Sequence, residues 1–227
     1  MQREIITTSD GSKTLLINGL NEHYHSHNGA YTEALHVFID NGLKKINNCE
    51  VNILELGFGT GLNVLVTVDY FKNQEQIKQI NYFTVEKYPI TPEEVQQLAY
   101  CENLKLPELN DIYHEMHAAP WAKDVSLLSG FVLHKINADF LQLDQIEMPE
   151  IDLVYFDCFG ARVQPDLWER PLVEKVAAKM HNGALLTTYS SKGSFRRILQ
   201  DVGFEVTKLA GPRGKREMIN AILNTKK

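Results

Sequence analysis

Residues 51–63 read Val-Asn-Ile-Leu-Glu-Leu-Gly-Phe-Gly-Thr-Gly-Leu-Asn, and this stretch decides the fold. The apolar run before Gly57 predicts a buried strand, and three glycines at alternate positions end it. Apolar residues then recur at helical spacing from Leu62 onward. Because glycine has no Cβ, the backbone here can turn sharply and a ligand can approach it closely. We expect a ligand at the carboxyl end of this strand, against the first turn of the helix.

The glycine pattern indicates which ligand the loop accepts. Gly57, Gly59 and Gly61 form G-x-G-x-G, whereas a dinucleotide site has G-x-G-x-x-G and holds a pyrophosphate on the helix N-terminus. The acidic Glu55 leads into the loop and would repel a pyrophosphate. A carboxylate there suits a ligand that carries an ammonium or a sulfonium. The loop resembles the first motif of class I S-adenosylmethionine-dependent methyltransferases, and this implies that Gly57, Phe58, Gly59, Gly61 and Asn63 contact the cofactor.

Two further acids follow predicted strands. Residues 81–87 read as a second strand that ends at Glu86, 25 residues after Gly61, and residues 131–139 read as a third strand that ends at Asp139. An acid at the end of the second strand commonly binds ribose hydroxyls. We expect Glu86 on the ribose and Asp139 beside the adenine amino group. A solvated strand end is the alternative for either acid alone.

The remaining elements define the fold class. The sequence predicts strands at 151–157, 184–190, 204–209 and 217–223, a helix over 165–180 closed by Asn182-Gly183, and a helix over 194–202 stopped by Gly203. The loop over 210–216 is too short for a crossover helix, so the last two strands must pair antiparallel. We therefore predict an α/β, doubly wound, mostly parallel seven-stranded sheet with a C-terminal antiparallel hairpin, which is Rossmann-like. A nicotinamide-binding sheet would normally end in parallel strands.

The first fifty residues stand apart from this pattern. Residues 5–7 and 14–17 flank the turn signal Ser9-Asp10-Gly11-Ser12, and a helix is expected over 32–43. We predict two regions: an N-terminal hairpin and helix over 1–50, which forms a lid or substrate wall, and a methyltransferase domain over 51–227.

The composition bears on membrane insertion, cellular compartment and metal binding. The chain has 227 residues and is 44% hydrophobic, and its sequence has no apolar run of the roughly 18 residues that a membrane span needs. Three scattered cysteines without C-x-x-C spacing favour a reducing cytoplasm. His23, His25 and His27 alternate, but no nearby ligand completes a known metal spacing, so we expect exposed polar residues and no metal.

Asp157 is the candidate catalytic residue because it ends the fourth strand, where the nucleophile meets the methyl donor in this fold. Methylation of an amine needs a neutral nitrogen aligned with the sulfonium carbon, and a carboxylate can orient the N–H groups or receive a proton. Support of the ribose or cofactor is the alternative for Asp157. Phe159 can cover a flat base. Cys158 is expected to be a small buried residue rather than a nucleophile.

The charge is unevenly distributed along the chain. The formal net charge is −6, but residues 187–227 contain 9 Lys and Arg against 3 Asp and Glu. Arg213, Lys215 and Arg216 lie in one short loop. A local basic rim that faces phosphates is compatible with an acidic body, and an ordinary solvated surface is the alternative.

Several segments together resemble the methyltransferase domain of the MnmC family, which completes 5-methylaminomethyl-2-thiouridine at the tRNA wobble position. The two most specific runs are 57–63, Gly-Phe-Gly-Thr-Gly-Leu-Asn, and 214–218, Gly-Lys-Arg-Glu-Met. The other matching pieces are 24–26, 28–29, 32–33, 37–39, 42–43, 83–90, 156–159, 165–168, 195–199 and 203–204. The family usually has glycine at the position of Cys158 and a proline shortly after Phe159, and this chain departs from both.

The resemblance implies methyl transfer from S-adenosyl-L-methionine to the primary amine of 5-aminomethyl-2-thiouridine in a tRNA substrate. It implies that Asp157 lies near both donor and amine. The residues expected on the substrate side are Tyr24, Ser26, Phe159, Arg213, Lys215 and Arg216. Because the chain ends at Lys227, we expect a stand-alone methyltransferase, with a separate flavin-dependent oxidoreductase acting upstream. Two alternatives stay open: a small-molecule aminopropyltransferase and a non-catalytic binding module.

Overall fold

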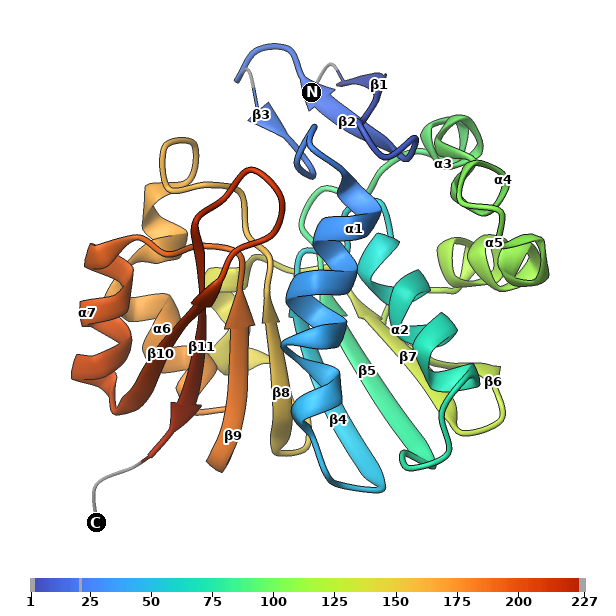
Figure 1. The fold of residues 1–227 in the computed structure, drawn as a ribbon. Coiled ribbons are helices and arrows are strands. Elements are labelled where there is room, and N and C mark those ends of the chain that lie inside the picture. Colours follow the sequence, from blue (N-terminus) through green and yellow to red (C-terminus); the bar gives the residue numbers. More distant parts are fainter. Residues whose placement is uncertain (1–2, 21, 225–227) are drawn as a thin grey trace.

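A twisted central sheet organises the chain in the computed structural model, which describes residues 3–20 and 22–224 (Figure 1). Five strands are parallel, and each end of the sheet is closed by antiparallel pairing. The spatial order is β10 (Phe204–Ala210), β11 (Glu217–Leu223), β9 (Met180–Thr188), β8 (Ile151–Phe156), β4 (Glu50–Leu56), β5 (Gln79–Val85), β7 (Phe131–Ile136) and β6 (Asp124–Leu128). The expected doubly wound sheet with a C-terminal antiparallel hairpin is therefore confirmed.

The sheet has eight strands rather than the predicted seven. The additional strand is β6, which pairs antiparallel with β7 across the short turn at Gly130. It lies at the edge of the sheet and is largely exposed, and only Leu127 within it is buried. An edge strand of only five residues depends on pairing with its neighbour, and its short Asp-Val-Ser-Leu-Leu sequence does not identify it as a strand by itself.

Helices cover both faces of the sheet. α1 (Ala30–Ala34) and α2 (Leu62–Lys72) lie on one face, while α6 (Arg170–Ala177) and α7 (Gly193–Val202) lie on the other (Figure 1). Strand side chains alternate between the two resulting cores: Ile53 belongs to the first and Leu54 to the second. The remaining helices, α3 (Pro92–Leu98), α4 (Tyr100–Asn103) and α5 (Asn110–Ala118), connect β5 to β6.

The helix predicted over 165–180 is wrong as a single element. Residues Pro165–Trp168 form a 3-10 turn, Glu169 is extended, and α6 begins only at Arg170. Pro171 lacks an N–H and its ring would clash with a carbonyl one turn earlier, so a continuous helix cannot pass through it. Asn182-Gly183 does not close the helix either, because it lies inside β9, where the register against β8 shifts and Gly183 has a φ of 91°.

The N-terminal residues form a second, smaller sheet above the carboxyl ends of the parallel strands (Figure 1). The predicted hairpin is present as β1 (Arg3–Thr7) and β2 (Lys13–Ile17), and β3 (Glu22–His23) adds a third strand. The helix expected over 32–43 appears as α1, a wider π-helical segment at Leu35–Asp40 and a 3-10 turn at Leu43–Lys45.

Candidate functional site

The site lies where the chain order of the sheet reverses. From β4 the chain runs outward to β5 and β7, then returns to β8 on the other side of β4. The loops that leave the carboxyl ends of β4 and β8 therefore diverge and leave a crevice between them. Ligands of open α/β sheets bind in a crevice of this kind. Gly57 and Asp157 open these two loops, and a Cβ on Gly57 would meet the Asp157 carbonyl oxygen at 3.1 Å.

The glycine loop is shaped for close approach. Gly57 has a φ of 106° and Gly59 a φ of 49°, a region that favours glycine. A Cβ on Gly59 would stand 3.1 Å from the ring of Tyr24, which belongs to the small N-terminal sheet region. The glycine loop thus packs against Asp157, which follows β8, and against Tyr24 of the N-terminal region, and its remaining side is open.

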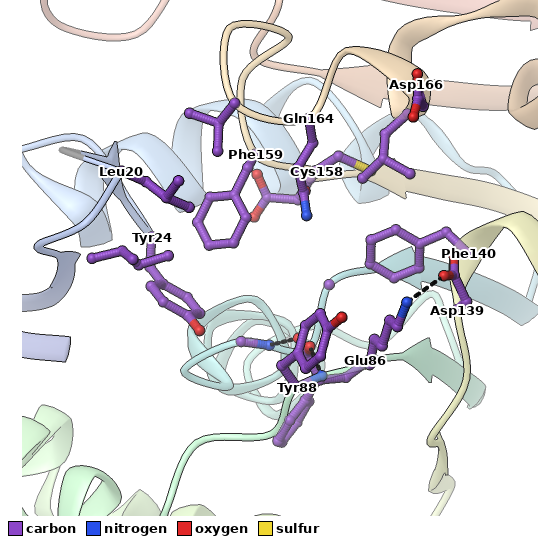
Figure 2. Close-up of a pocket in the computed structure, with 18 of the residues that line it drawn as sticks. Leu20, Tyr24, Glu86, Tyr88, Asp139, Phe140, Cys158, Phe159, Gln164 and Asp166 are labelled. Atoms are coloured by element: carbon purple, nitrogen blue, oxygen red, sulfur yellow. Dashed lines mark hydrogen bonds and ion pairs between the residues drawn. The ribbon is translucent and has the colours of Figure 1, made fainter. Parts of the chain in front are cut away.

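A first cavity of about 290 Å³ lies along this open side (Figure 2). Figure 2 shows Glu86 and Tyr88 on one side and Cys158, Phe159 and Gln164 on the opposite side. The predicted cofactor-binding residues that line it are Gly57, Phe58, Gly59, Glu86, Asp139 and Asp157. Tyr24 and Phe159, expected on the substrate side, also line it.

Glu86 is fixed by the backbone. Its two carboxylate oxygens accept hydrogen bonds from the Gly59 N–H at 3.0 Å and the Tyr88 N–H at 2.7 Å. Each oxygen keeps a lone pair for a further partner. The carboxylate is therefore held rigidly at the cavity wall.

Asp139 follows β7 and is held from two sides. It accepts a hydrogen bond from the Leu141 N–H at 2.9 Å, and Lys87 Nζ lies 2.7 Å away (Figure 2). These contacts, with the lysine bond the larger effect, hold the pKa of Asp139 below its ordinary value. The carboxylate stays ionised near neutral pH and lines the cavity at its outer end.

Asp157 faces both this cavity and a second one. Asn63 in the first turn of α2 donates a hydrogen bond from Nδ2 to Asp157 Oδ2 at 2.8 Å. Burial raises the pKa of Asp157 to about 7, the bond from Asn63 opposes that rise, and the Glu33 carboxylate adds to it. Asp157 is thus poised to change protonation near neutral pH.

The second cavity, of about 310 Å³, adjoins the first. Lys215, from the loop between β10 and β11, forms an ion pair with Glu33 of α1 at 2.9 Å. Its ammonium also lies 3.9 Å from the ring centre of Tyr189, which follows β9. Ser26 lines this cavity with them. The two cavities share Tyr24, His25, Asp157, Cys158 and Phe159.

An aromatic pair stands at the border between the cavities. The rings of Tyr24 and Phe159 meet edge to face with centroids 4.9 Å apart. The Phe159 backbone is anchored because its carbonyl accepts a hydrogen bond from Trp168 Nε1 at 2.7 Å. Cys158 is only 2% exposed, and burial raises its thiol pKa well above the ordinary value, which agrees with a small buried residue rather than a nucleophile.

Not every predicted site residue reaches a cavity. Glu55 is fully buried beneath the glycine loop and Asn63 is 2% exposed, so neither lines the walls. Gly61 begins α2 and packs against α5 instead. Arg213 and Arg216 are exposed beside Lys215 but lie outside both cavities.

Sequence reasoning missed several wall residues. Glu33 and Tyr189 are far apart in sequence and become neighbours only through Lys215. A signal for Tyr189 existed, because it lies near the carboxyl end of the strand predicted over 184–190. His25 was expected to be exposed, yet it is half-buried, and its Nε2 lies 2.8 Å from the Thr60 hydroxyl. Burial lowers the pKa of His25 to about 4, so the ring is neutral at the cavity wall.

The arrangement suits a cationic ligand that carries a ribose. Carboxylates stand at three places along the wall, Glu86, Asp139 and Asp157, and the glycine backbone leaves room for close approach. Within the described ranges no cluster of three or more histidine, cysteine or acidic side chains has the geometry to hold a metal ion. None of the helices in the described part of the chain is long and apolar enough to span a membrane.

Comparisons with known proteins agree with this geometry. Residues 132–224 match a family described as S-adenosyl-L-methionine-dependent methyltransferase. The chain is 31% identical over 175 residues to the tRNA 5-methylaminomethyl-2-thiouridine biosynthesis bifunctional protein MnmC of Idiomarina loihiensis, covering 74% of this chain and 29% of that protein. The protein of the same name from Marinobacter nauticus is 30% identical over 222 residues, covering 89% and 34%. The chain thus spans about a third of these relatives.

Two solved structures share the fold. MNMC2 from Aquifex aeolicus has a TM-score of 0.75 at 24% identity and covers 99% of this chain and 71% of that chain. A probable spermidine synthase from Corynebacterium glutamicum has a TM-score of 0.54 at 13% identity, covering 99% and 77%. At these identities the likeness concerns the fold alone.

Proposed function

We propose that this chain, which carries an MnmC-like methyltransferase domain of the S-adenosyl-L-methionine-dependent class, methylates the aminomethyl nitrogen of 5-aminomethyl-2-thiouridine at the tRNA wobble position. The observation that carries the proposal is the place of Asp157, on the shared wall of two adjoining cavities. One cavity fits the methyl donor, and the other is open to an incoming amine. Both reactants therefore meet at one carboxylate.

The residues of the first cavity supply the binding of S-adenosyl-L-methionine. Gly57 and Gly59 would admit it against their backbone, Glu86 would accept from the ribose hydroxyls, and Asp139 would accept from the adenine amino group; all four residues line the first cavity. Hydrogen bonds of this charge-assisted kind contribute about 1.5–3 kcal/mol each. When bound, the cofactor supplies a sulfonium methyl carbon that is open to attack by a nucleophile.

Asp157 then acts on the amine. Its carboxylate accepts a hydrogen bond from the substrate nitrogen, directs the lone pair toward the methyl carbon, and takes up the proton that the methylated nitrogen releases. Asn63 holds the other side of this carboxylate, which restricts its rotation. Alignment of two reactants in this way can lower a barrier by about 7–11 kcal/mol.

The second cavity and its rim receive the tRNA. Phe159, against which Tyr24 packs edge to face, covers one face of the wobble base, and Lys215 closes the cavity from the β10–β11 loop. Arg213 and Arg216 extend the positive charge to the nearby phosphates. The base must be unstacked to reach the recessed methyl group. The N-terminal region, in its described residues 3–20 and 22–50, would form the wall above the site.

The reaction belongs to the cytoplasm, where tRNA is the partner and a flavin-dependent oxidoreductase supplies the aminomethyl substrate from its carboxylated precursor. The relatives that support this are named bifunctional, and this chain matches about a third of their length. Co-purification of a distinct flavoprotein with the native protein would indicate that the oxidoreductase is a separate protein.

The test uses S-adenosyl-L-methionine with an isotopically labelled methyl group and tRNA that carries 5-aminomethyl-2-thiouridine. Digestion to nucleosides should yield labelled 5-methylaminomethyl-2-thiouridine, and tRNA without the aminomethyl group should yield none. A parallel reaction contains decarboxylated S-adenosylmethionine and a diamine. Product in that reaction alone would identify an aminopropyltransferase, and cofactor binding without product in either would identify a binding module.

A further inference from the structure

His25 borders both cavities and is held by a buried chain of hydroxyl groups. Its Nε2 lies 2.8 Å from Oγ1 of Thr60, the residue between Gly59 and Gly61. The Tyr100 hydroxyl of α4 donates to the same Oγ1 at 2.9 Å, and Thr60 and Tyr100 are both fully buried. Thr60 thus connects a histidine at the cavity wall with a phenol in the core.

The direction of these hydrogen bonds follows from their burial. Thr60 accepts from Tyr100, and its own hydroxyl hydrogen needs an acceptor, because an unpaired buried hydroxyl is costly. The acceptor within reach is His25 Nε2. If Nε2 carried the proton instead, Thr60 Oγ1 would accept twice, and its hydrogen would have no partner in the described part of the chain. Nε2 is therefore unprotonated, and in a neutral ring the proton lies on Nδ1.

The protonated nitrogen, Nδ1, is the one that a ligand can reach. It has no partner among residues 3–20 and 22–224, and protein atoms do not seal it from the cavities that His25 lines. Burial of the ring lowers the pKa of His25 to about 4, and the Lys215 ammonium at the second cavity adds to this effect. At neutral pH the wall therefore presents one N–H donor without a charge.

The place of this donor indicates which atom it meets. His25 and Asp157 belong to the same wall, which borders both cavities. In a 5-aminomethyluridine base the aminomethyl group and O4 are attached to neighbouring ring carbons, so a base whose amine faces Asp157 brings O4 to this wall. The other polar side chains on it are less suited. Cys158 is 2% exposed, and the Tyr24 hydroxyl points toward the Glu86 side of the first cavity (Figure 2).

We propose that His25 is a specificity-determining residue whose Nδ1–H donates to O4 of the wobble pyrimidine, so that the site admits uridine and rejects cytidine. The inference rests on the proposed function, in which the aminomethyl nitrogen of this base meets Asp157. Cytidine carries an amino group at C4, which is a donor. Two donors would then meet at a partly buried place, and each would lose its partner.

A carboxylate of the cofactor is the other oxygen acceptor that could meet His25. Three acidic side chains, Glu22, Glu33 and Asp157, line the second cavity, and Lys215 is already paired with Glu33. A further anion at this wall would therefore be repelled. The uncharged donor of His25 matches an uncharged carbonyl oxygen better than a carboxylate.

Two anticodon stem-loop RNAs test the proposal, one with 5-aminomethyluridine and one with 5-aminomethylcytidine at the wobble position. With the native protein we expect kcat/KM to be at least about thirtyfold higher for the uridine RNA. His25→Phe retains a ring but has no N–H, so it should lower this ratio at least about tenfold, mainly through lost activity on the uridine RNA. Calorimetric affinity for S-adenosyl-L-methionine should stay within about threefold.

His114→Phe is the matched control, because His114 is exposed on α5 and lines neither cavity. It should retain the native ratio. An unchanged ratio in His25→Phe overturns the proposal, and so does a loss of about tenfold or more in cofactor affinity, which would assign His25 to the cofactor carboxylate. Methylation of neither RNA by the native protein would contradict the proposed function itself, and the inference with it.

The position of the proton has a test that needs no RNA. Heteronuclear NMR of nitrogen-labelled histidines should show His25 with a protonated Nδ1 and an unprotonated Nε2 at neutral pH. Thr60→Val retains the shape of the side chain but removes the hydroxyl, so the proton is free to move to Nε2 and the ratio between the two RNAs should fall although the imidazole is present. A proton on Nε2 in the native protein, or an unchanged tautomer and ratio in Thr60→Val, overturns the proposal.

Discussion

At the scale of single residues, three carboxylates of the first cavity lie in different surroundings. Glu86 is held by two backbone N–H groups, Asp139 by a lysine and one N–H, and Asp157 by a single amide. Charge-stabilised Asp139 stays ionised, whereas burial shifts Asp157 toward neutrality. The residue that changes protonation near pH 7 is therefore the one that we propose as the partner of the amine.

Asp157→Asn should lower kcat by about two orders of magnitude or more, because the amide retains shape but cannot take up a proton. In the native protein kcat should fall as pH drops below about 7, where Asp157 becomes protonated. Calorimetry with S-adenosyl-L-methionine serves as the control and should still show binding. Unchanged turnover in the variant would remove Asp157 from the catalytic step.

Glu86→Ala should weaken the binding of S-adenosyl-L-methionine by about tenfold to a hundredfold, since hydrogen bonds to the ribose and support of the Gly59 N–H are lost together. Glu93→Ala is a matched control, because Glu93 lies on the exposed face of α3 and does not line the cavity. Equal affinities in the two variants would contradict the ribose assignment.

At the scale of elements, the sequence predicts those helices and strands that are marked by a strong local pattern of apolar residues and glycines. The strand before Gly57 and the helix after it were predictable, because three closely spaced glycines separate two apolar segments of different length. Edge strand β6 was not, because its stability depends on β7. The cavity walls were partly predictable: Glu86 and Asp157 follow strands, but Glu33 reaches the site only through tertiary contact with Lys215.

The ion pair between α1 and the β10–β11 loop provides a prediction for these elements. Lys215→Ala removes both the contact with Glu33 and the ammonium over Tyr189. We expect kcat/KM for tRNA to fall at least about tenfold while affinity for S-adenosyl-L-methionine changes by less than about threefold, because the lysine lines only the second cavity.

Lys208→Ala is the matched control on the same hairpin, where Lys208 pairs with Glu217 at the surface. This variant should behave like the native protein, since exposed ion pairs contribute little. If the Lys215 and Lys208 variants lose activity equally, the loop acts through its stability and not through the cavity.

At the scale of the whole molecule, an acidic body carries a basic C-terminal region. The charge near Arg213 and Arg216 lies on the same side of the sheet as the cavities, because their loop borders the second one. The phosphates of a tRNA would be attracted by this basic loop and repelled by the acidic remainder of the surface. This difference favours one docking orientation.

The salt dependence of tRNA binding reports how many phosphates the basic loop contacts. Arg213→Ala with Arg216→Ala should reduce the slope of log affinity against log salt by roughly 1.5–2, in line with two lost phosphate contacts. Lys72→Ala is the control, because Lys72 ends α2 and is therefore remote from the loops at the carboxyl edge. A slope unchanged by the double substitution, or changed equally by Lys72→Ala, would exclude phosphate contacts at this rim.

We propose that a methyl group passes to the aminomethyl nitrogen beside Asp157. The most direct test of this proposal is a single turnover with deuterated-methyl S-adenosyl-L-methionine, followed by fragmentation mass spectrometry of the isolated wobble nucleoside. We expect the label on the exocyclic nitrogen in the native protein, and a rate of labelling lower by about two orders of magnitude or more with Asp157→Asn. Label on a ring nitrogen, on sulfur or on the ribose would contradict the proposal.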